Sequence, residues 1–373
     1  MMMKSKKREK NVLILMPQLF MGGSERQVRY IAEGLENANV RQTILVENGS
    51  LLDDECRDYV EKHRSSHFIF LGLNTLGSEN KTLKNKIKSL YFLYKWIFVH
   101  GSEFTWIMFT NLTGLMCVPI CKAKGIRVLF NERNPGVKMC NSSLKRELLK
   151  SCNKVVANSK SAAEYMSKTL KINVECINNG ILEKKLPKSE KKGDIVSILV
   201  PARINPVKNQ MVVLRAIEIL RKEININCCF AGQVEDQEYS KKLLKYVRKH
   251  QLENYVSFPG YVSQIDEMYA NADLIILPSF EEGTPNVVLE AYYNKKPCLA
   301  SNIVMNRDIA IDSRILFETE NAQNVADKIS WIIGLDNKEK TKLLYKGYDF
   351  VKNNYSLEAM QNKYLKIFNE TYK

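Results

Sequence analysis

Short continuous runs of apolar residues alternate with longer amphipathic stretches along most of the chain. Val12–Met16 is such a run; it is too short for a buried helix and is bounded by a proline and two glycines. A run of this kind predicts a central parallel strand that is buried on both faces. The next stretch repeats apolar residues at helical spacing, at Val28, Ile31, Ala32 and Leu35. Strand, glycine turn and helix in this order form the unit of an open α/β sheet.

Two series of such units follow one another. The first continues with strands expected at Thr43–Val46, Phe68–Leu71, Trp106–Phe109, Arg127–Phe130 and Lys154–Ala157. The second has strands expected at Ser197–Val200, Cys228–Ala231, Val256–Phe258, Leu274–Leu277 and Pro297–Ala300, and helices at Met211–Glu223, Tyr239–Gln251 and Asn286–Asn294. A single core stops growing at roughly 250–300 residues, so a chain of 373 residues suits two domains. We predict two doubly wound α/β domains, 1–186 and 194–354, joined by a polar linker at 187–193.

The segment SFEEGTPNVVLEAYYNKKPCLAS (279–301) carries the strongest candidate chemistry. It places Glu282 in a turn, begins a helix at Pro285 and places Glu290 about one turn inside that helix. The backbone N–H groups of the first helical turn are expected to point, unsatisfied, toward an anion. Glu282 and Glu290 can each accept hydrogen bonds from adjacent hydroxyls of a sugar or a ribose. The alternative is a helix-start acid and a solvated helix residue.

Two further loops carry residues that suit phosphate. In LVPARINPVKNQMVVLRAI (199–217), Arg203 and Lys208 follow the carboxyl end of a strand. A planar guanidinium and a mobile ammonium suit a diphosphate, although two surface cations would have the same spacing. In MGGSERQ (21–27), Gly22 and Gly23 allow the backbone to approach a ligand at a helix N-terminus. This is not the G-x-G-x-x-G fingerprint, and taken alone it is a tight turn.

In order and spacing, four segments resemble glycosyltransferase family 4, the glycosyl transferases group 1 module of the GT-B fold: PARINPVKNQ (201–210), FAGQ (230–233), PGYV (259–262) and EEGTPNVVLEA (281–291). The resemblance covers about residues 155–335 well, and MGGSERQ, ANSKSAAEYM (157–166) and NNGI (178–181) extend it more loosely. NERNP (131–135) stands where the family often has a histidine, and is a variant associated with capsule, O-antigen and other glycan-assembly members. Asn209, Lys296 and Asp308 also depart from the family's usual residues.

For the donor, the resemblance implies that Arg203 and Lys208 hold the diphosphate of a nucleotide-sugar and stabilise the leaving nucleotide. Glu282 would contact the transferred sugar, and Glu290 would bind the ribose. The other residues that it implies in donor binding are Gly22, Gly23, Gly232, Gly283, Thr284, Pro285, Asn286 and Val287. The anomeric configuration would be retained, without a metal or other cofactor.

For the architecture, the resemblance implies a GT-B fold in which two Rossmann-like domains face a cleft. The N-terminal domain would bind the acceptor, and Glu132 or Arg133 would line the acceptor side. The C-terminal helix, within residues 355–373, would cross back to the N-terminal domain.

The positive charge is concentrated in the first half of the chain. Residues 1–192 hold 33 basic against 18 acidic side chains, whereas residues 193–373 hold 23 of each. This asymmetry suggests a polyanionic partner, either nucleic acid or an anionic membrane surface. KTLKNKIKSLYFLYKWIFVH (81–100) is a basic, aromatic-rich amphipathic helix, as membrane-surface elements are, although an exposed helix with one face on the core has the same pattern. We favour the membrane because the same domain holds the surplus charge.

The cysteines and the N-terminus bear on location. Nine cysteines without a C-x-x-C pair are typical of reduced, buried thiols in a cytosolic protein. The basic stretch at 1–10 and the apolar run after it imitate a signal peptide, but Pro17 and Gln18 interrupt the run and no cleavage site follows. No apolar run reaches the ~20 residues of a spanning helix. We expect a cytoplasmic protein, peripheral on the inner face of the cytoplasmic membrane.

Two spacings that can bind metal have a simpler explanation. His63 and His67 are four residues apart, as are Cys117 and Cys121, but no third ligand accompanies either pair. We expect His63 and His67 on a solvated helix face and no metal site.

The function favoured by these patterns is transfer of a hexose or N-acetylhexosamine from a UDP-linked donor to a lipid-linked or polysaccharide acceptor. A nucleotide-sugar epimerase of the same fold is the first alternative. The second is a basic nucleic-acid-binding protein, against which stands the absence of a recognised RNA- or DNA-binding motif.

Overall fold

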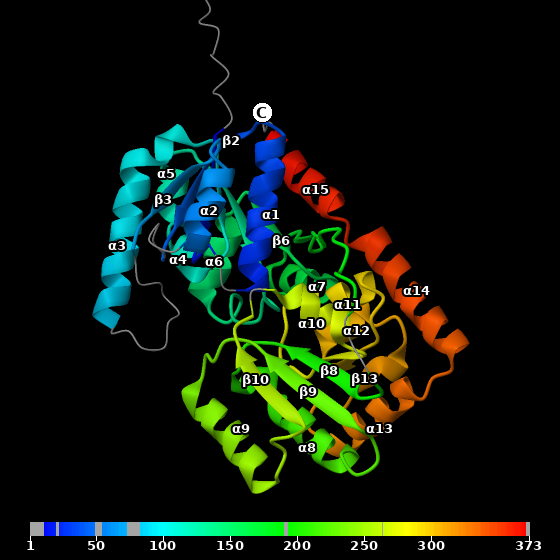
Figure 1. Ribbon diagram of the computed structural model, residues 1–373. Coiled ribbons are helices and arrows are strands. Elements are labelled where there is room, and N and C mark those ends of the chain that lie inside the picture. Colours follow the sequence, from blue (N-terminus) through cyan, green and yellow to red (C-terminus); the bar gives the residue numbers. More distant parts are fainter. Residues whose placement is uncertain are drawn as a thin grey trace, which may run out of the picture. The chain divides into compact units, whose positions relative to one another are not determined.

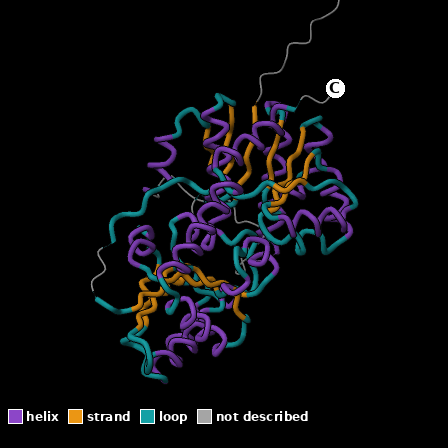
Figure 2. The backbone as a smooth tube through the Cα atoms, turned by 90° about the vertical axis from the view of Figure 1, so that its right-hand side faces the viewer, coloured by secondary structure: helices purple, strands orange, loops and turns teal. Residues whose placement is uncertain are grey.

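The computed structural model describes residues 11–19, 22–48, 54–72, 83–189, 193–262 and 264–370, and the chain divides into two compact units (Figure 1). Unit 1 comprises Met1–Gly180 and Leu357–Lys373, and unit 2 comprises Ile181–Ser356. Each unit is built on one parallel sheet with helices packed on it (Figure 2). The prediction of two doubly wound α/β domains is confirmed.

Unit 1 has a seven-stranded sheet with the order β3-β2-β1-β4-β5-β6-β7. Its strands are β1 (Asn11–Met16), β2 (Arg41–Val46), β3 (His67–Phe70), β4 (Trp106–Phe109), β5 (Arg127–Glu132), β6 (Lys154–Ala157) and β7 (Glu175–Cys176). Its helices are α1 (Gly23–Asn37), α2 (Asp54–Lys62), α3 (Leu83–His100), α4 (Leu112–Met116), α5 (Val118–Ala123), α6 (Ser143–Ser151), α7 (Lys160–Leu170) and α15 (Leu357–Asn369). The strand order reverses between β1 and β4, which is where open α/β sheets bind ligands at their carboxyl edge.

The sheet of unit 1 is covered on both faces because its central strands are apolar on both faces. In β1, Leu13 and Leu15 belong to a core cluster that includes residues of α3 to α7. Val12, Ile14 and Met16 belong to a second cluster with residues of α1, α2 and α15. The period-2 alternation of a strand thus supplies two cores from one continuous apolar run.

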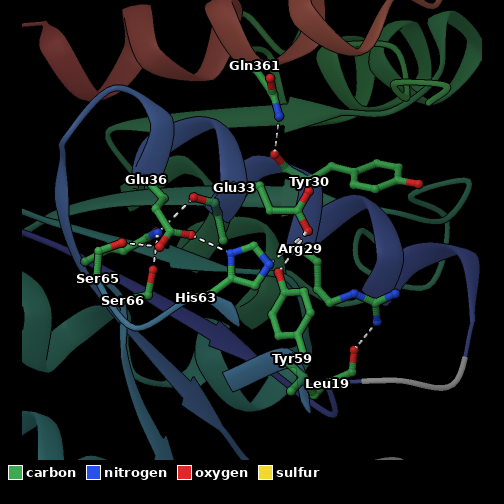
Figure 3. Close-up of polar contacts among 12 residues, drawn as sticks. Leu19, Arg29, Tyr30, Glu33, Glu36, Tyr59, His63, Ser65, Ser66 and Gln361 are labelled. Carbon is green, nitrogen blue, oxygen red and sulfur yellow. Dashed lines mark hydrogen bonds and ion pairs between the residues drawn. The ribbon is translucent and has the colours of Figure 1, made fainter. Parts of the chain in front are cut away.

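The last helix, α15, returns to unit 1 and packs along α1, as the resemblance implied. Tyr364 and Phe368 are fully buried on this helix, and the ring of Phe368 meets Trp106 edge-on at 5.8 Å. A Cβ at Gly34 of α1 would lie 2.6 Å from Cγ of Gln361, so the two helices approach closely there. The amide of Gln361 donates to the carbonyl of Tyr30 at 2.8 Å (Figure 3).

A polar network joins α2 to α1 (Figure 3). His63 Nδ1 lies 2.6 Å from a carboxylate oxygen of Glu36, and the imidazole packs against Tyr59 with the ring planes tilted by 38° and the centroids 4.2 Å apart. The hydroxyl of Tyr59 donates to Glu33 at 3.0 Å, and the guanidinium of Arg29 lies 5.6 Å from the Tyr59 ring centroid. The prediction of a solvated face at His63 is wrong, because two carboxylates of α1 draw the imidazole against that helix.

Unit 2 has a six-stranded sheet with the order β10-β9-β8-β11-β12-β13. Its strands are β8 (Val196–Pro201), β9 (Ile226–Ala231), β10 (Val256–Gly260), β11 (Leu274–Leu277), β12 (Cys298–Ser301) and β13 (Leu316–Phe317). Its helices are α8 (Gln210–Leu220), α9 (Gln237–Lys249), α10 (Ile265–Asn271), α11 (Asn286–Tyr293), α12 (Val304–Ile309), α13 (Ala322–Ile333) and α14 (Asn337–Asn354). The order reverses between β8 and β11, and the loops after these two strands, together with helix α11, carry most of the predicted site residues.

The chain passes from unit 1 to unit 2 earlier than the polar run 187–193 indicated. In unit 1, Gly180 is held by the buried amide of Gln27, which pairs with its backbone N–H and C=O at 2.8 Å each. In unit 2, Ile181 pairs with Ser356, and Lys184 forms an ion pair with Asp266. Residues from 181 onward therefore run along unit 2 instead of forming a free linker. Residues 190–192 of the predicted linker lie outside the described part.

Within the described residues, no helix is long and apolar enough to cross a membrane. All nine cysteines are free thiols, six of them buried and three partly buried. Burial raises the pKa of the Cys140 thiol to about 11 and that of Cys152 to about 12, so these thiols stay protonated at neutral pH.

Candidate active site

The loop after β8 is held in a defined conformation by its own asparagines. The side chain of Asn205 accepts a hydrogen bond from the backbone N–H of Lys208 at 3.0 Å and so caps the short 3₁₀ turn Pro206–Lys208. Asn209 adopts a left-handed conformation with φ of 50°, which asparagine tolerates better than most residues. The Asn209 amide donates to the carbonyls of Pro278 and Thr319 at 3.3 and 2.7 Å.

The two predicted cations of this loop have carboxylate partners. Lys208 Nζ lies 2.6 Å from a carboxylate oxygen of Glu282, and the side chains are only 17% and 12% exposed. Arg203 Nη1 lies 2.6 Å from Glu235, and both of these side chains are about two-fifths exposed, at 43% and 44%. The fold therefore brings together Lys208 and Glu282, which are 74 residues apart in the sequence.

The loop after β11 lies directly against the loop of Lys208. The backbone N–H of Phe280 donates to the carbonyl of Val207 at 2.8 Å, which fixes the neighbouring Glu282 beside the 3₁₀ turn. Gly283 is partly exposed, Thr284 and Pro285 are buried, and Asn286 begins α11 with Val287 as its second residue.

The start of α11 differs from the prediction in two respects. Pro285 is the N-cap residue rather than the first helical residue, so the helix begins one position later. The N–H groups of Asn286 and Val288 are not free for an anion, because they donate to the carbonyls of Thr284 and Pro285 at 2.9 and 3.0 Å. The tight proline turn satisfies these donors locally.

Glu290 and Gly232 have clear local roles. Glu290 lies in the second turn of α11, where one carboxylate oxygen accepts the hydroxyl of Tyr269 at 3.1 Å. Tyr269, on α10, is 3% exposed, so Glu290 is oriented by a buried partner. Gly232 follows β9, and a Cβ there would clash with the carbonyl of Ala202 and lie 2.9 Å from the N atom of Arg203. Only glycine lets these two strand ends approach so closely.

A cavity of about 610 Å³ opens at the carboxyl ends of β12 and β13. Its lining residues are Asn302, Glu318, Thr319, Glu320, Asn321 and Ala322. Thr319 also accepts the hydrogen bond from Asn209, so the cavity adjoins the loop that carries Lys208. Arg203, Lys208, Gly232, Glu282 and Glu290 thus all lie in loops or on helices at the carboxyl ends of the unit 2 strands.

Gly22 and Gly23 lie in unit 1 at the start of α1. Gly22 is exposed and has an extended backbone with φ of −167°, so its conformation does not require glycine. Met21, beside it, lies outside the described residues. The contact of these glycines with a donor phosphate stays a prediction.

Glu132 and Arg133 are buried inside unit 1. One oxygen of Glu132 accepts the backbone N–H groups of Arg133 and Asn134 at 3.1 and 2.9 Å, and Arg133 Nη2 donates to Asn179 at 2.6 Å. Burial raises the pKa of Glu132 to about 7. Glu47, after β2, is also buried with a pKa raised to about 7, and accepts the Asn111 amide at 3.1 Å. The acceptor role of Glu132 or Arg133 stays a prediction.

The sequence did not point to Glu235, Asn205 or Tyr269, although each contacts a predicted site residue. Their positions depend on pairing between β8 and β9 and on packing of α10 against its neighbours. No local pattern marks them; the nearest indication is that Glu235 follows the FAGQ segment by two residues.

Two family descriptions match adjoining parts of the chain. Residues 21–183 match Glycosyltransferase Family 4, and residues 182–349 match Glycosyl transferases group 1. Over 135 residues the chain is 30% identical to the capsular polysaccharide biosynthesis glycosyltransferase CapH of Staphylococcus aureus, a match that covers 36% of this chain and 38% of CapH. The chain therefore spans less than half of that relative's length.

Solved structures share the whole architecture. The crystal structure of Anabaena Alr3699/HepE in complex with UDP and glucose has a TM-score of 0.77 at 15% identity, covering 96% of this chain and 99% of that chain. A mutant of S. aureus TarM in complex with Fondaparinux, alpha-GlcNAc-glycerol and UDP has a TM-score of 0.76 at 13% identity, covering 97% and 100%. At such identities the likeness establishes the fold, which is GT-B. The two family matches together span residues 21–349 and show that the chain belongs to glycosyltransferase family 4, the glycosyl transferases group 1 family.

Proposed function

We propose that the protein is a retaining glycosyltransferase that moves a hexose or N-acetylhexosamine from a UDP-linked sugar to a lipid-linked or polysaccharide acceptor. The observation that carries this proposal is the 2.6 Å contact between Lys208 and Glu282 at the carboxyl edge of the unit 2 sheet. Transfer of a sugar from a nucleoside diphosphate needs a cation beside the diphosphate and groups that hold the sugar, and the neighbouring side chains of Lys208 and Glu282 suit these two tasks. The UDP in the HepE and TarM structures and the polysaccharide role printed for CapH agree with this substrate class.

In this proposal, Arg203 and Lys208 bind the donor diphosphate and stabilise the negative charge that develops as UDP leaves. Glu282 orients the sugar through its hydroxyls, and Glu290 holds the ribose. Because cationic side chains supply the positive charge, the transfer needs no metal.

The test is a panel of nucleotide-sugars in which release of nucleoside diphosphate is measured with and without lipid-linked acceptors. Lys208→Ala, Arg203→Ala and Glu282→Ala are each expected to lower turnover by about 100-fold or more, the usual effect of losing one charge-stabilising group. Lys249→Ala, an exposed cation on α9, is the matched control and should leave turnover unchanged.

Two outcomes of this panel, and one of a separate nucleic-acid binding assay, would contradict the proposal. Turnover that survives loss of Lys208 or Glu282 would exclude the site. Conversion of the donor without sugar transfer would identify an epimerase. Tight retention of nucleic acid in a filter-binding assay at moderate salt, without turnover of any donor, would favour the nucleic-acid-binding alternative.

We further propose that α3 holds the enzyme on an anionic membrane, on the cytoplasmic side where nucleotide-sugars are found. Leu93 and Ile97 of this helix are buried in the unit 1 core, whereas Tyr91 and Phe98 are 67% and 58% exposed. Ile87, Phe92, Tyr94 and Val99 are exposed as well. The helix thus has a second apolar face in addition to the one that holds it to its own unit.

Basic residues accompany this second face. Lys95 lies on the helix, and Lys124 Nζ lies 4.7 Å from the ring centroid of Phe98. Residues 81–82, and the side chains at 83–86 and 88–89, lie outside the described part. Exposed aromatic rings beside lysines suit the boundary between lipid headgroups and acyl chains.

A further inference from the structure

The side chain of Glu235 connects the segments that follow β8 and β9, in addition to the backbone hydrogen bonds between these segments. Beyond the two strands, Ile204 N donates to the carbonyl of Gln233 at 2.9 Å, and Glu235 N donates to the carbonyl of Ile204 at 3.1 Å. This backbone pairing sets the Glu235 side chain beside the Arg203 loop. One carboxylate oxygen contacts Arg203 Nη1 at 2.6 Å, and the other accepts the side-chain amide of Asn205.

Through Asn205 the same carboxylate reaches the turn of Lys208. The amide nitrogen of Asn205 faces Glu235, so its oxygen is left to accept the N–H of Lys208 at 3.0 Å. If this amide turned over, both contacts would be lost together. Glu235 is thereby connected to the side chain of one predicted diphosphate-binding cation and to the backbone of the other.

We propose that Glu235 is a positioning residue that clamps the β8–α8 loop, Arg203 to Asn209, in the geometry that binds the donor diphosphate. The inference rests on the proposed function, since the task that it gives Glu235 is to position the loop proposed to bind the donor diphosphate. Arg203 contacts Glu235 through Nη1, and a guanidinium has further N–H groups that can face a phosphate. The clamp therefore orients the guanidinium without consuming all of its donors.

The direction in which Glu235→Gln changes the affinity for UDP shows whether Glu235 positions the loop or only lies beside it. Glu235 places a negative charge beside a loop that binds an anion. If it did nothing more, Glu235→Gln would remove repulsion, and UDP would bind more tightly. A clamp predicts the reverse, because the glutamine carboxamide offers one acceptor oxygen and one donor NH2 group in place of two acceptor oxygens. It keeps one of the two contacts and sets donor against donor at the other.

The experiment compares wild type, Glu235→Gln, Glu235→Ala and Glu235→Asp in UDP binding by calorimetry and in donor kinetics. We expect kcat to fall by about tenfold or more in Glu235→Gln and Glu235→Ala, with weaker UDP binding, since small displacements of such groups cost up to ~100-fold. Glu235→Asp, which keeps both oxygens, should restore part of kcat. Glu238→Gln, an exposed carboxylate on α9 that pairs with Lys241, makes the same charge change and should leave both quantities unchanged.

Two further measurements test how the clamp acts. Hydrogen exchange of the unliganded protein should be faster in residues 203–209 of Glu235→Gln than of wild type. The double variant Glu235→Gln, Asn205→Ala should lose little more activity than the more impaired single variant, because both residues belong to one chain of contacts.

Tighter or unchanged UDP binding by Glu235→Gln, or unchanged exchange in the loop, would overturn the clamp. Faster exchange in the loop of a protein whose wild type binds no UDP and turns over no nucleotide-sugar would instead overturn the proposed function, while the structural connection through Glu235 would stand.

Discussion

At the scale of single residues, unit 1 holds two carboxyl groups in conditions that oppose their ionisation. Glu47 and Glu132 are each 1% exposed, and burial raises the pKa of both to about 7. In the unfolded chain the same groups titrate near 4.5. Between these values the folded protein holds more protons than the unfolded chain does, so the free energy of unfolding falls as pH rises from about 4.5 to about 7. Above about pH 7 this decrease is complete, and each group has then lowered the free energy of unfolding by up to about 3 kcal/mol.

This titration gives a prediction for Glu47→Gln, which cannot ionise. Its urea midpoint relative to wild type should rise with pH between about 4.5 and 7 and should change little above that range. It should also change little below about pH 4.5, where residue 47 is neutral in both proteins, folded or unfolded. The measurement is urea unfolding at several pH values. Glu61→Gln, on the exposed side of α2, is the control and should shift the midpoint equally at every pH. A difference for Glu47→Gln that does not vary with pH would show that the carboxylate is ionised in the folded protein.

At the scale of elements, α3 stands out because its outer face is as apolar as a packed face. The exposed residues Ile87, Tyr91, Tyr94 and Phe98 follow one another at helical spacing and form a stripe along the helix. A stripe of this length is more than the scattered apolar residues of an ordinary surface.

The membrane proposal predicts how strongly vesicles retain a double variant that carries Tyr91→Ser and Phe98→Ser. The double variant should be retained less by vesicles containing anionic lipid, while its free energy of unfolding stays within about 1 kcal/mol of wild type because neither ring is buried. Sedimentation with vesicles measures retention, and raising the salt should weaken it. Tyr345→Ser, an exposed aromatic residue of α14, is the matched control. Equal retention on neutral vesicles would rule out the electrostatic part.

The elements that the sequence predicted best are those with long apolar runs. Nearly every expected strand lies within two residues of an observed one, because a strand buried on both faces leaves a continuous apolar run. The strands β7 and β13 were missed; each has two residues and pairs at a sheet edge, so no run marks it. The boundary at 187–193 was placed too late because charge and polarity mark solvent exposure, whereas Lys184 is charged and lies on unit 2.

The candidate site was predictable only where a local motif carries it. Arg203, Lys208 and Glu282 follow strands whose ends the fold gathers at one edge, so motif and topology agree. Glu235 and Tyr269 come from outside the motifs, because side-chain partners across neighbouring strands and helices depend on tertiary packing. The prediction of free N–H groups at the start of α11 was wrong for a different, local reason: the carbonyls of Thr284 and Pro285 accept hydrogen bonds from Asn286 and Val288.

At the scale of the whole molecule, the two units differ in how the chain builds them. Unit 2 is one continuous segment, Ile181–Ser356, with a single core cluster of its own. Its first and last residues pair with each other, and Ile181 N donates to Tyr355 O at 2.9 Å. Unit 1 needs both ends of the chain, because α15 supplies Tyr364 and Phe368 to its core.

A fragment of residues 181–356 is therefore predicted to fold by itself, since compact units with their own core usually do. It should unfold cooperatively in urea, and in the proposed function it should bind UDP, with Lys208→Ala weakening that binding. Circular dichroism and calorimetry measure the two properties. The complementary fragment 1–180, which lacks α15, should unfold at lower urea or without a cooperative transition. A non-cooperative 181–356 fragment would show that its core depends on the rest of the chain.

The close approach at Gly180 has a consequence for chimeras. A Cβ on Gly180 would lie 2.8 Å from Cα of Leu357, so the two points at which unit 2 is inserted into unit 1 are neighbours. Unit 2 is inserted into unit 1, and the residues of unit 1 on either side of the insertion, Gly180 and Leu357, lie close together. If unit 2 were transplanted, Ile181 and Ser356 would belong to the transplanted segment, whereas Gln27, Gly180 and Leu357 would remain in unit 1. In the proposed function, splicing at the bonds 180–181 and 356–357 is expected to exchange the donor-binding unit without disturbing either core.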